Sequence, residues 1–403
     1  MFRFILVFTF AISACATATM GNTKINDTLH TENTQSFQQF LNTLRVTAMK
    51  KGVSSATLDR AFTGLTPDPR IIKYDRNQAE FTLNFWRYIN SRVSDNRLQK
   101  GRIKLQENQE LLNRVYKKYG VPPSVLVAFW GLETNYGRHV GKMNLVRSLA
   151  TLSFDKRRRA FFTGELLVLL QLIDLGKLPL TVEGSWAGAM GNLQFMPSNV
   201  QAYAIDKDKD GKLDLWGGSK ADIFYTGSNF LKNIGWRQGE RWGEEVKVAK
   251  NFEFSLANLK TKKTVQAWQK LGVTRTDGQA FSNPSQMASL LLPMGYQGPA
   301  FLVYRNFRTI LRWNRSILYA LSVGHLADRI MGKSALIALP IAEPSLRRED
   351  IQAIQTKLNT LGFDTGKPDG IPGPKTRGAV RAYQQENGLP VDGYVGYQLL
   401  QKL

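Results

Sequence analysis

The sequence predicts a mainly α-helical protein with two folded units. Apolar residues recur at intervals of three and four along much of the chain, which is the spacing of an amphipathic helix. Proline and glycine interrupt these runs where helices are expected to begin and end. A proline-containing stretch at 340–344 separates the last sixty residues. We therefore expect a large helical unit followed by a small one.

The composition indicates a globular chain with an anionic partner. Hydrophobic residues make up 43% of the 403 residues, which suffices for large cores. The 54 Lys and Arg residues exceed the 32 Asp and Glu residues, and the net charge is +22. This excess favours a nucleic acid, a membrane surface or an acidic polymer as partner, without choosing among them.

The N-terminus resembles a bacterial export signal, in which a basic start precedes a short apolar run and small residues. Residues 12–15 resemble a lipobox, whose cleavage leaves Cys15 as a lipid-modified N-terminus. Ordinary cleavage after residue 16 is the alternative. Cys15 is the only cysteine, and lipidation explains its presence. We expect a signal peptide at 1–16 (a lipoprotein signal at 1–14) and a polar tether at 17–34.

This N-terminus predicts an exported, periplasmic protein anchored to the outer membrane, and it argues against nucleic acid as partner. No later run reaches about 18 apolar residues, so we expect no transmembrane helix in the mature chain.

The central stretch of the chain is 121–137. Helical periodicity begins near residue 35, and a basic amphipathic helix is expected at 92–119. A Pro pair then opens an almost wholly apolar helix, at whose end a single acid, Glu133, appears. Phe129 and Trp130 lie on the same helix face as Glu133. Apolar surroundings raise the pKa of a carboxyl group, which suits a general acid. The alternative is a solvent-facing acid at a helix end.

Two later segments have the composition of ligand-binding surfaces. A basic cluster at 155–159 lies between helices expected at 144–152 and 159–175, and it is either a solvated face or a grip on an anionic ligand. Residues 183–198 combine Gly and Ala with Trp186 and Phe195, whose flat rings suit sugars. A tight turn between helices is the alternative there.

Residues 206–217 have the acid spacing of a calcium loop. Acids occupy positions 1, 3, 5 and 9, and glycine occupies position 6. Gly217 stands at position 12, where a bidentate Glu is expected. We therefore predict a possible structural Ca²⁺ site, whose ligands are Asp206, Asp208, Asp210 and Asp214.

The rest of the chain ends in a repeat. Helices are expected at 222–234 and 301–321, whereas 237–300 gives no clear pattern. After a linker at 338–346, helices at 350–361 and 376–386 are each followed by an Asp-Gly turn. Because this tail has no His or Cys, we interpret it as a binding module.

Four ordered motifs resemble the lytic murein transglycosylases of the membrane-bound B type. They are LETNYG at 132–137, SWAGAMG at 185–191, QFMPS at 194–198 and the acidic loop at 206–216. The tail is similar to a three-helix peptidoglycan-binding domain. The resemblance implies a lysozyme-like, α-rich catalytic domain at 35–337 with a small loop-rich insertion, and a peptidoglycan-binding domain at 347–403.

The resemblance also implies an activity on peptidoglycan glycan strands. The family cleaves the β-1,4 bond between N-acetylmuramic acid and N-acetylglucosamine without water or a catalytic cofactor, leaving a 1,6-anhydromuramoyl end. Glu133 matches its catalytic acid. Trp313 and Phe230 depart from the family, which often has tyrosines there. The implied substrate-binding residues are Tyr88, Arg157, Arg158, Ser185, Gln194, Asn314 and Tyr319.

A single acid is consistent with this chemistry. An ordinary glycosidase needs two carboxylates, but Asp155 lies in a basic run and Glu183 opens the Gly-rich segment. One acid suffices if Glu133 protonates the leaving O4 and then takes the proton of the muramoyl O6 as that oxygen attacks C1. A hydrolytic muramidase and a non-catalytic wall-binding protein are the alternatives.

Overall fold

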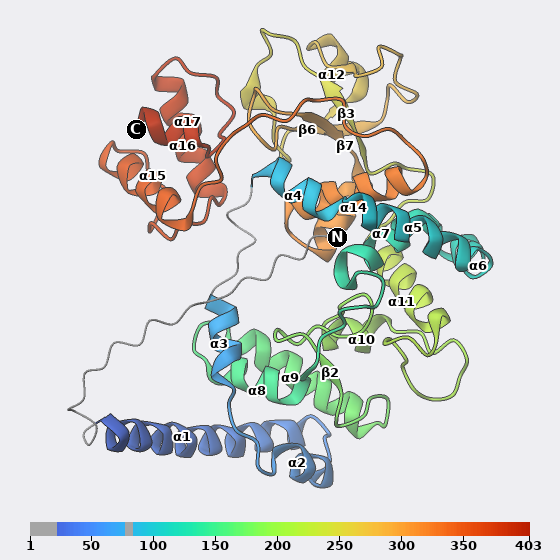
Figure 1. The fold of residues 1–403 in the computed structure, drawn as a ribbon, viewed down its shortest axis with the longest axis vertical. Helices are drawn as coiled ribbons and strands as arrows, with labels where there is room; N and C mark the ends of the chain where they lie inside the picture. Colours follow the sequence, from blue (N-terminus) through green and yellow to red (C-terminus); the bar gives the residue numbers. More distant parts are fainter. Residues whose placement is uncertain (1–21, 77–83) are drawn as a thin grey trace, which may run out of the picture.

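Helices dominate the fold, which confirms the predicted class. The structure is a computed structural model that describes residues 22–76 and 84–403. The helices before the main sheet are α1 (Asn22–Lys50), α2 (Ser55–Phe62), α3 (Pro69–Arg76), α4 (Phe85–Arg92), α5 (Asp95–Glu107), α6 (Gln109–Tyr119), α7 (Pro123–Thr134), α8 (Leu145–Phe154), α9 (Arg159–Asp174), α10 (Pro197–Tyr203) and α11 (Lys220–Asn233). Two further helices, α13 (Arg305–Trp313) and α14 (Ile317–Ile330), follow the sheet and rejoin this bundle (Figure 1). Among the described residues no helix is long and apolar enough to span a membrane.

The predicted central helix is α7. Pro122 and Pro123 begin it, since proline at the first turn loses no needed N–H. All its residues except Pro123 and Glu133 are buried, because α5 and α14 pack against it. Asn135 and Tyr136 then take the left-handed conformation, with φ of 51° and 62°. These two residues end the helix just after Glu133.

Two helix boundaries differ from the prediction. The stretch 92–119 contains α5, α6 and the end of α4, because Ser94 accepts a hydrogen bond from the Arg97 N–H and so starts a new helix. The helix α1 begins at Asn22, inside the segment 17–34 expected to be a tether. Packing stabilises α1 from Phe37 onwards, and once that part is helical, extending the helix towards the N-terminus costs little free energy. The predicted signal and Cys15 lie outside the described residues.

Residues 237–300, which show no clear secondary-structure pattern in the sequence, contribute most of a small sheet. The short pair β1 (Met143–Asn144) and β2 (Glu183–Gly184) is separate from it. The strands of the main sheet are β3 (Gly243–Lys247), β4 (Lys263–Thr264), β5 (Thr274–Arg275), β6 (Met287–Leu291) and β7 (Ala300–Val303), with a 3₁₀ turn η2 (Phe254–Leu256) and α12 (Val265–Lys270) between them. They pair antiparallel in the order β4-β6-β7-β3-β5. The loop-rich insertion implied by the resemblance is therefore built on a sheet.

The strand β7 explains why a helix starting at residue 301 was wrong. Its side chains alternate between two cores. Phe301 and Val303 join the helical core, whereas Ala300 and Leu302 join a smaller core with Trp268. A strand buried on both faces is an uninterrupted apolar run, which sequence periodicity does not distinguish from a helix.

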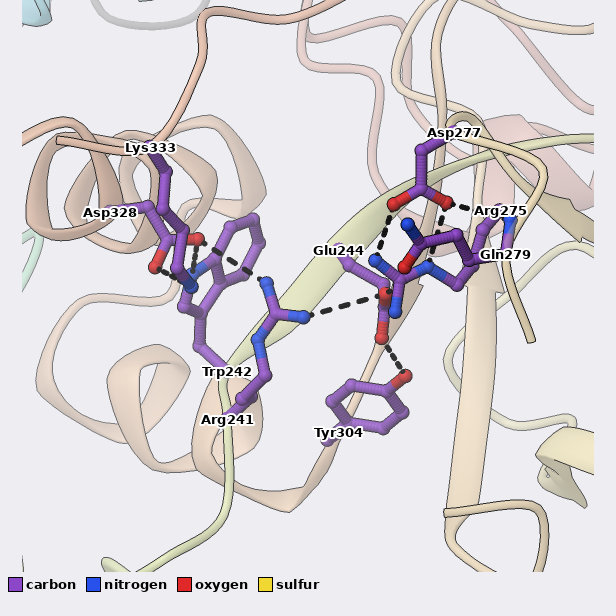
Figure 2. A network of polar contacts seen from close by, with 9 residues as sticks. All are labelled: Arg241, Trp242, Glu244, Arg275, Asp277, Gln279, Tyr304, Asp328 and Lys333. Carbon is purple, nitrogen blue, oxygen red and sulfur yellow. Dashed lines mark hydrogen bonds and ion pairs between the residues drawn. The ribbon is translucent and has the colours of Figure 1, made fainter. Parts of the chain in front are cut away.

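A polar network fastens the sheet to the C-terminal end of α14 (Figure 2). Asp328 of α14 accepts from the Trp242 indole at 3.1 Å and pairs with Lys333 at 2.7 Å. Arg241 lies between Asp328 (3.6 Å) and Glu244 of β3 (3.4 Å). Glu244 also accepts from the Tyr304 hydroxyl, and burial together with this carboxylate raises the pKa of Tyr304.

The tail folds as α15 (Arg348–Thr360), α16 (Pro374–Glu386) and α17 (Tyr397–Lys402) around its own core. The two copies of the internal repeat make the same side-chain hydrogen bonds. The Gln355 amide accepts from the Gly370 N–H and donates to the Asp369 carboxylate, and Gln384 makes the same pair of bonds to Asp392-Gly393. Each helix therefore holds the Asp-Gly turn that follows it.

Candidate active site

Glu133 lies half-buried at the last turn of α7, where two donors meet on one of its oxygens. The Trp313 indole N–H donates to Oε1 at 3.0 Å, and the Tyr319 hydroxyl donates to the same atom at 2.5 Å. Trp313 is the last residue of α13 and Tyr319 lies in the first turn of α14, so three helices orient this carboxyl group. Hydrogen bonds of this kind favour a carboxylate's charged form, whereas apolar surroundings oppose it.

An aromatic wall surrounds Trp313. Its ring stacks on Phe129 of α7, with centroids 4.2 Å apart and planes at 30°. Phe195 and Phe230 pack against it at 5.1 and 5.2 Å. The two departures from the family are thus neighbours. Trp313 still supplies a donor to Glu133, whereas Phe230 supplies only apolar surface.

Burial sets the protonation state of Tyr319. Burial raises its pKa well above the usual 10, and the charge and hydrogen bond of Glu133 add to this. Its hydroxyl therefore remains a donor throughout the physiological range. Tyr88 further raises this pKa and Arg92 lowers it, which places these α4 side chains close to the site. Tyr88 is itself buried, and Arg92 lies over its ring at 5.2 Å.

Asn192 holds the end of α7 in place, and the sequence analysis did not select it. Its Oδ1 accepts from the Trp130 indole at 2.6 Å, and its carbonyl accepts from the Thr134 hydroxyl at 2.8 Å. Its own Nδ2 donates to the Leu215 carbonyl at 3.1 Å. Gly137 is needed beside it, because a Cβ there would lie 2.6 Å from Asn192 Oδ1. Asn192 directly follows the motif SWAGAMG at 185–191, and its partner Thr134 belongs to the motif LETNYG at 132–137. These two motifs were the sequence signal that could have pointed to Asn192.

Three of the predicted binding residues shape the loops around the site. Ser185 Oγ accepts from the Ala189 N–H at 3.0 Å. Gln194 has a φ of 51°, and its Nε2 donates to the carbonyls of Val140 and Gly191. Asn314 follows Trp313 directly, and its Oδ1 accepts from the Ser316 N–H. Residues 183–198 thus form a compact series of turns joined by isolated β-bridges. This conformation is compatible both with a ligand-binding surface and with a tight turn between helices.

Arg157 and Arg158 both pair with the buried carboxylate of Asp75 in α3. The Arg157 Nε–H donates to Asp75 Oδ2 at 3.0 Å. These ion pairs join α3 to the turn between α8 and α9. The basic cluster is therefore not simply a solvated surface, and its two arginines are already paired with an acid of the protein. A ligand carboxylate would have to share these guanidinium groups with Asp75. The alternative acid Asp155 pairs with Arg76 at 3.2 Å, and Glu183 is exposed on β2.

The acidic loop brings together three of its four predicted ligands. Oxygens of Asp206, Asp208 and Asp210 lie within 4.8 Å of one another. Asp206 Oδ1 is buried and has no hydrogen-bond partner among the residues that the structure describes, as expected of an oxygen that a cation completes. This donor set fits the all-oxygen coordination of Ca²⁺.

Asp214, the fourth predicted ligand, lies outside this close group and remains a predicted ligand. Its carboxylate accepts from the backbone N–H groups of Trp216, Gly217 and Ser219. These bonds stabilise the turn that leads into α11. The buried Asp222 completes the turn by accepting from the N–H groups of Lys207 and Asp214. Burial raises the pKa of Asp222.

The chain is similar to a known protein family over most of its length. The model of the family described as "Transglycosylase SLT domain" matches residues 36–328. The chain belongs to the transglycosylase SLT domain family. A second model, "Putative peptidoglycan binding domain", matches residues 347–403, which are the whole tail.

Other members of the SLT family show how far the similarity extends. Membrane-bound lytic murein transglycosylase B of Escherichia coli K12 is 36% identical over 248 residues, which cover 60% of this chain and 66% of that protein. The chain thus spans about two thirds of that relative's length. The crystal structure of SltB3 from Pseudomonas aeruginosa in complex with NAG-anhNAM-pentapeptide has a TM-score of 0.87 and 42% identity, covering 91% of this chain and 99% of SltB3.

A further similar structure contains calcium. The lytic transglycosylase Slt35 of E. coli, in a structure with calcium, has a TM-score of 0.62 and 32% identity, covering 74% of this chain and 93% of that one.

Proposed function

We propose that this SLT-family protein is a lytic transglycosylase that cleaves the β-1,4 bond between N-acetylmuramic acid and N-acetylglucosamine in peptidoglycan, forming 1,6-anhydromuramoyl ends during cell-wall remodelling or turnover. One observation carries the proposal. The carboxyl group of Glu133, at the end of a buried helix, lies against the aromatic wall and is oriented by hydrogen bonds from Trp313 and Tyr319. The two proteins compared above over most of this chain support the assignment through their names and bound ligand.

In the proposed reaction Glu133 acts first as an acid and then as a base. The protonated carboxyl group gives its proton to the departing O4 of N-acetylglucosamine. The muramoyl acetamido group stabilises the developing charge at C1. The carboxylate then accepts the proton of the muramoyl O6 as that oxygen bonds to C1. The intramolecular attack gains from proximity once the sugar is held in place.

The fixed donors on Oε1 fit this exchange of roles. Because the Tyr319 hydroxyl stays protonated, both donors persist while Glu133 changes charge. They stabilise the carboxylate formed in the first step and hold its orientation for the second. No cofactor takes part in the proposed chemistry.

We assign substrate contacts to the residues gathered around this carboxyl group. Gln194 and Asn314 are next in sequence to Phe195 and Trp313 of the aromatic wall. Ser185 belongs to the same stretch 183–198 as Gln194, and the Tyr88 side chain influences the pKa of Tyr319. Arg157 and Arg158 are proposed to meet lactyl or peptide carboxylates while they remain paired with Asp75.

We further propose that lipidated Cys15 anchors the exported protein to the outer membrane from the periplasmic side, and that 347–403 binds peptidoglycan. This arrangement fits the basic charge of the chain, since the wall is an anionic polymer. Asp206, Asp208 and Asp210 are proposed to hold a structural Ca²⁺ that fixes the shape of the acidic loop.

Digestion of purified sacculi tests the proposed reaction. The unmutated protein should release muropeptides that are one water lighter than hydrolytic products. The Glu133→Gln variant should lose about 10²–10⁴-fold of this rate. Glu110→Gln, which changes a highly exposed acid, is the matched control. Reducing ends alone would indicate a muramidase, and full lysis by Glu133→Gln would indicate that Glu133 is not catalytic.

A further inference from the structure

Two arginines of the tail, Arg377 and Arg381, lie one turn apart on α16 and therefore on the same face. The turn at Gly393 packs directly onto them. A Cβ placed on Gly393 would lie 2.8 Å from Arg381 Cζ and 3.0 Å from the Arg377 carbonyl oxygen. Both arginines are half-buried, so backbone covers part of each cation.

Among the described residues, the Arg377 guanidinium lacks the partner that its counterpart in the first repeat has. In the first copy Arg348 occupies the position of Arg377, and its Nε–H donates to the Asp369 carbonyl at 3.0 Å. In the second copy the matching carbonyl, of Asp392, instead accepts from Arg381 at 3.4 Å. Throughout the described part of the chain, no hydrogen bond or ion pair engages the Arg377 guanidinium.

The Asp392 charge offsets part of this positive charge, but within the described residues no carboxylate oxygen pairs directly with either guanidinium group. The Asp392 carboxylate accepts from Gln384, from the Tyr394 N–H and from the Tyr296 N–H of the catalytic part. The linker acid Glu343 accepts from the Tyr394 hydroxyl and the Tyr397 N–H.

The two guanidinium groups are also short of hydrogen bonds. Within the described part of the chain, Arg381 Nε is buried without a hydrogen-bond partner. Burial lowers the pKa of both arginines, and for Arg377 the neighbouring Arg381 adds to this, whereas the Asp392 charge acts in the opposite direction at both. A desolvated cation pair with unused donors is costly unless an anion completes it.

We propose that Arg377 and Arg381 form an anion site in the tail that binds a carboxylate of the peptidoglycan stem peptide. This inference rests on the proposed function, because it takes peptidoglycan as the substrate. Two planar guanidinium groups suit a carboxylate, which accepts paired N–H donors. The first repeat has Gln352 where the second has Arg381, so only the second repeat carries this site. The tail would thus recognise stem peptides while the catalytic part acts on the glycan.

Binding to insoluble sacculi tests the site. The full chain with Glu133→Gln, which should leave the polymer uncut, is sedimented with three preparations. These are intact sacculi, sacculi whose carboxylates are amidated with carbodiimide and ammonia, and sacculi stripped of stems by an amidase. The apparent Kd should rise at least about tenfold on both modified preparations. Unchanged binding to amidated sacculi overturns the site. Unchanged binding to stripped sacculi overturns the stem-peptide source, because amidase cleavage removes the stem carboxylates and leaves only a newly freed lactyl carboxylate.

Variants locate the effect on these residues. In the same background, R377Q/R381Q should weaken binding to intact sacculi at least about tenfold. The control K357Q/K367Q removes the same charge from exposed tail lysines without ion pairs in the described structure, and it should bind almost as before. Equal binding of the two double variants contradicts the proposal.

A conservative variant and an activity assay complete the design. If R377Q/R381Q does not fold, R377K/R381K keeps the charge but loses the planar fork, and it should still weaken binding measurably. Anhydro ends are measured separately with Glu133 intact. Their absence would contradict the proposed function, whereas equal binding of the two double variants would contradict only the carboxylate site.

Discussion

The indole N–H of Trp313 donates a 3.0 Å hydrogen bond to Oε1 of Glu133, across 180 residues of sequence. The same indole stacks on Phe129, one helical turn before Glu133. Trp313 therefore fixes both the carboxyl group and the helix that carries it.

Trp313→Phe should keep the stacking and remove the donor. Loss of a hydrogen bond to a charged group costs about 1.5–3 kcal/mol, so we expect kcat to fall roughly 10- to 100-fold. The pKa of Glu133 should rise, which moves the alkaline limb of the pH–rate profile upward. Steady-state release of anhydro-muropeptides between pH 4 and 9 measures both effects. Trp86→Phe is the control, because the buried Trp86 indole N–H has no hydrogen-bond partner in the described structure. An unchanged profile for Trp313→Phe would refute this role.

Asn192→Ala should destabilise the catalytic part. It leaves the buried Trp130 indole without its acceptor and removes one bond to the Leu215 carbonyl. A buried polar group left unsatisfied costs about 1–3 kcal/mol, so we expect a loss of about 2–4 kcal/mol in denaturant titrations. The exposed Asn233→Ala should change stability by less than about 0.5 kcal/mol. If the two variants are equally stable, Asn192 does not anchor α7.

Calcium should stabilise the folded protein without entering the chemistry. Binding to the native state alone adds RT ln(1 + [L]/Kd), or about 2.7 kcal/mol at a hundredfold excess over Kd. We expect the melting temperature to rise with Ca²⁺ over a chelated sample, and this rise to disappear in Asp206→Asn. Asp214→Asn is expected to lower the melting temperature in both conditions, since Asp214 serves the turn. Equal melting temperatures of the unmutated protein with and without Ca²⁺ would rule out the site.

His325 should make stability depend on acid pH. Burial, followed by the charge of Arg329, lowers its pKa to about 4, while Asp328 acts in the opposite direction. The unfolded chain therefore binds the proton more readily. The contribution of His325 is complete above its ordinary pKa of about 6.5 and is lost as pH falls towards 4.

The unmutated protein should consequently lose about 2.5 kcal/mol relative to His325→Gln between pH 7 and pH 4.5. Urea titrations of both proteins at the two pH values measure this difference. Parallel pH dependence in the two proteins would show that His325 is not buried in its neutral form.

The sequence determined the local features of this protein. The Pro pair and the apolar run were enough to predict α7 and to select Glu133, and the Asp-Gly turns predicted the repeat in the tail. These features depend on short-range rules of helix initiation, periodicity and turn chemistry. The carboxyl group's predicted protonation remains a prediction.

Only the tertiary structure decided which distant groups meet. Nothing in sequence spacing places Trp313 and Tyr319 on one oxygen of Glu133, pairs Arg157 with Asp75, or leaves the Arg377 guanidinium without a partner among the described residues. The sheet was missed for the same reason, because β7 is an apolar run whose pairing partners lie elsewhere in the chain. Such contacts depend on how whole helices and strands pack, and that packing fixes the donors, charges and burial around Glu133.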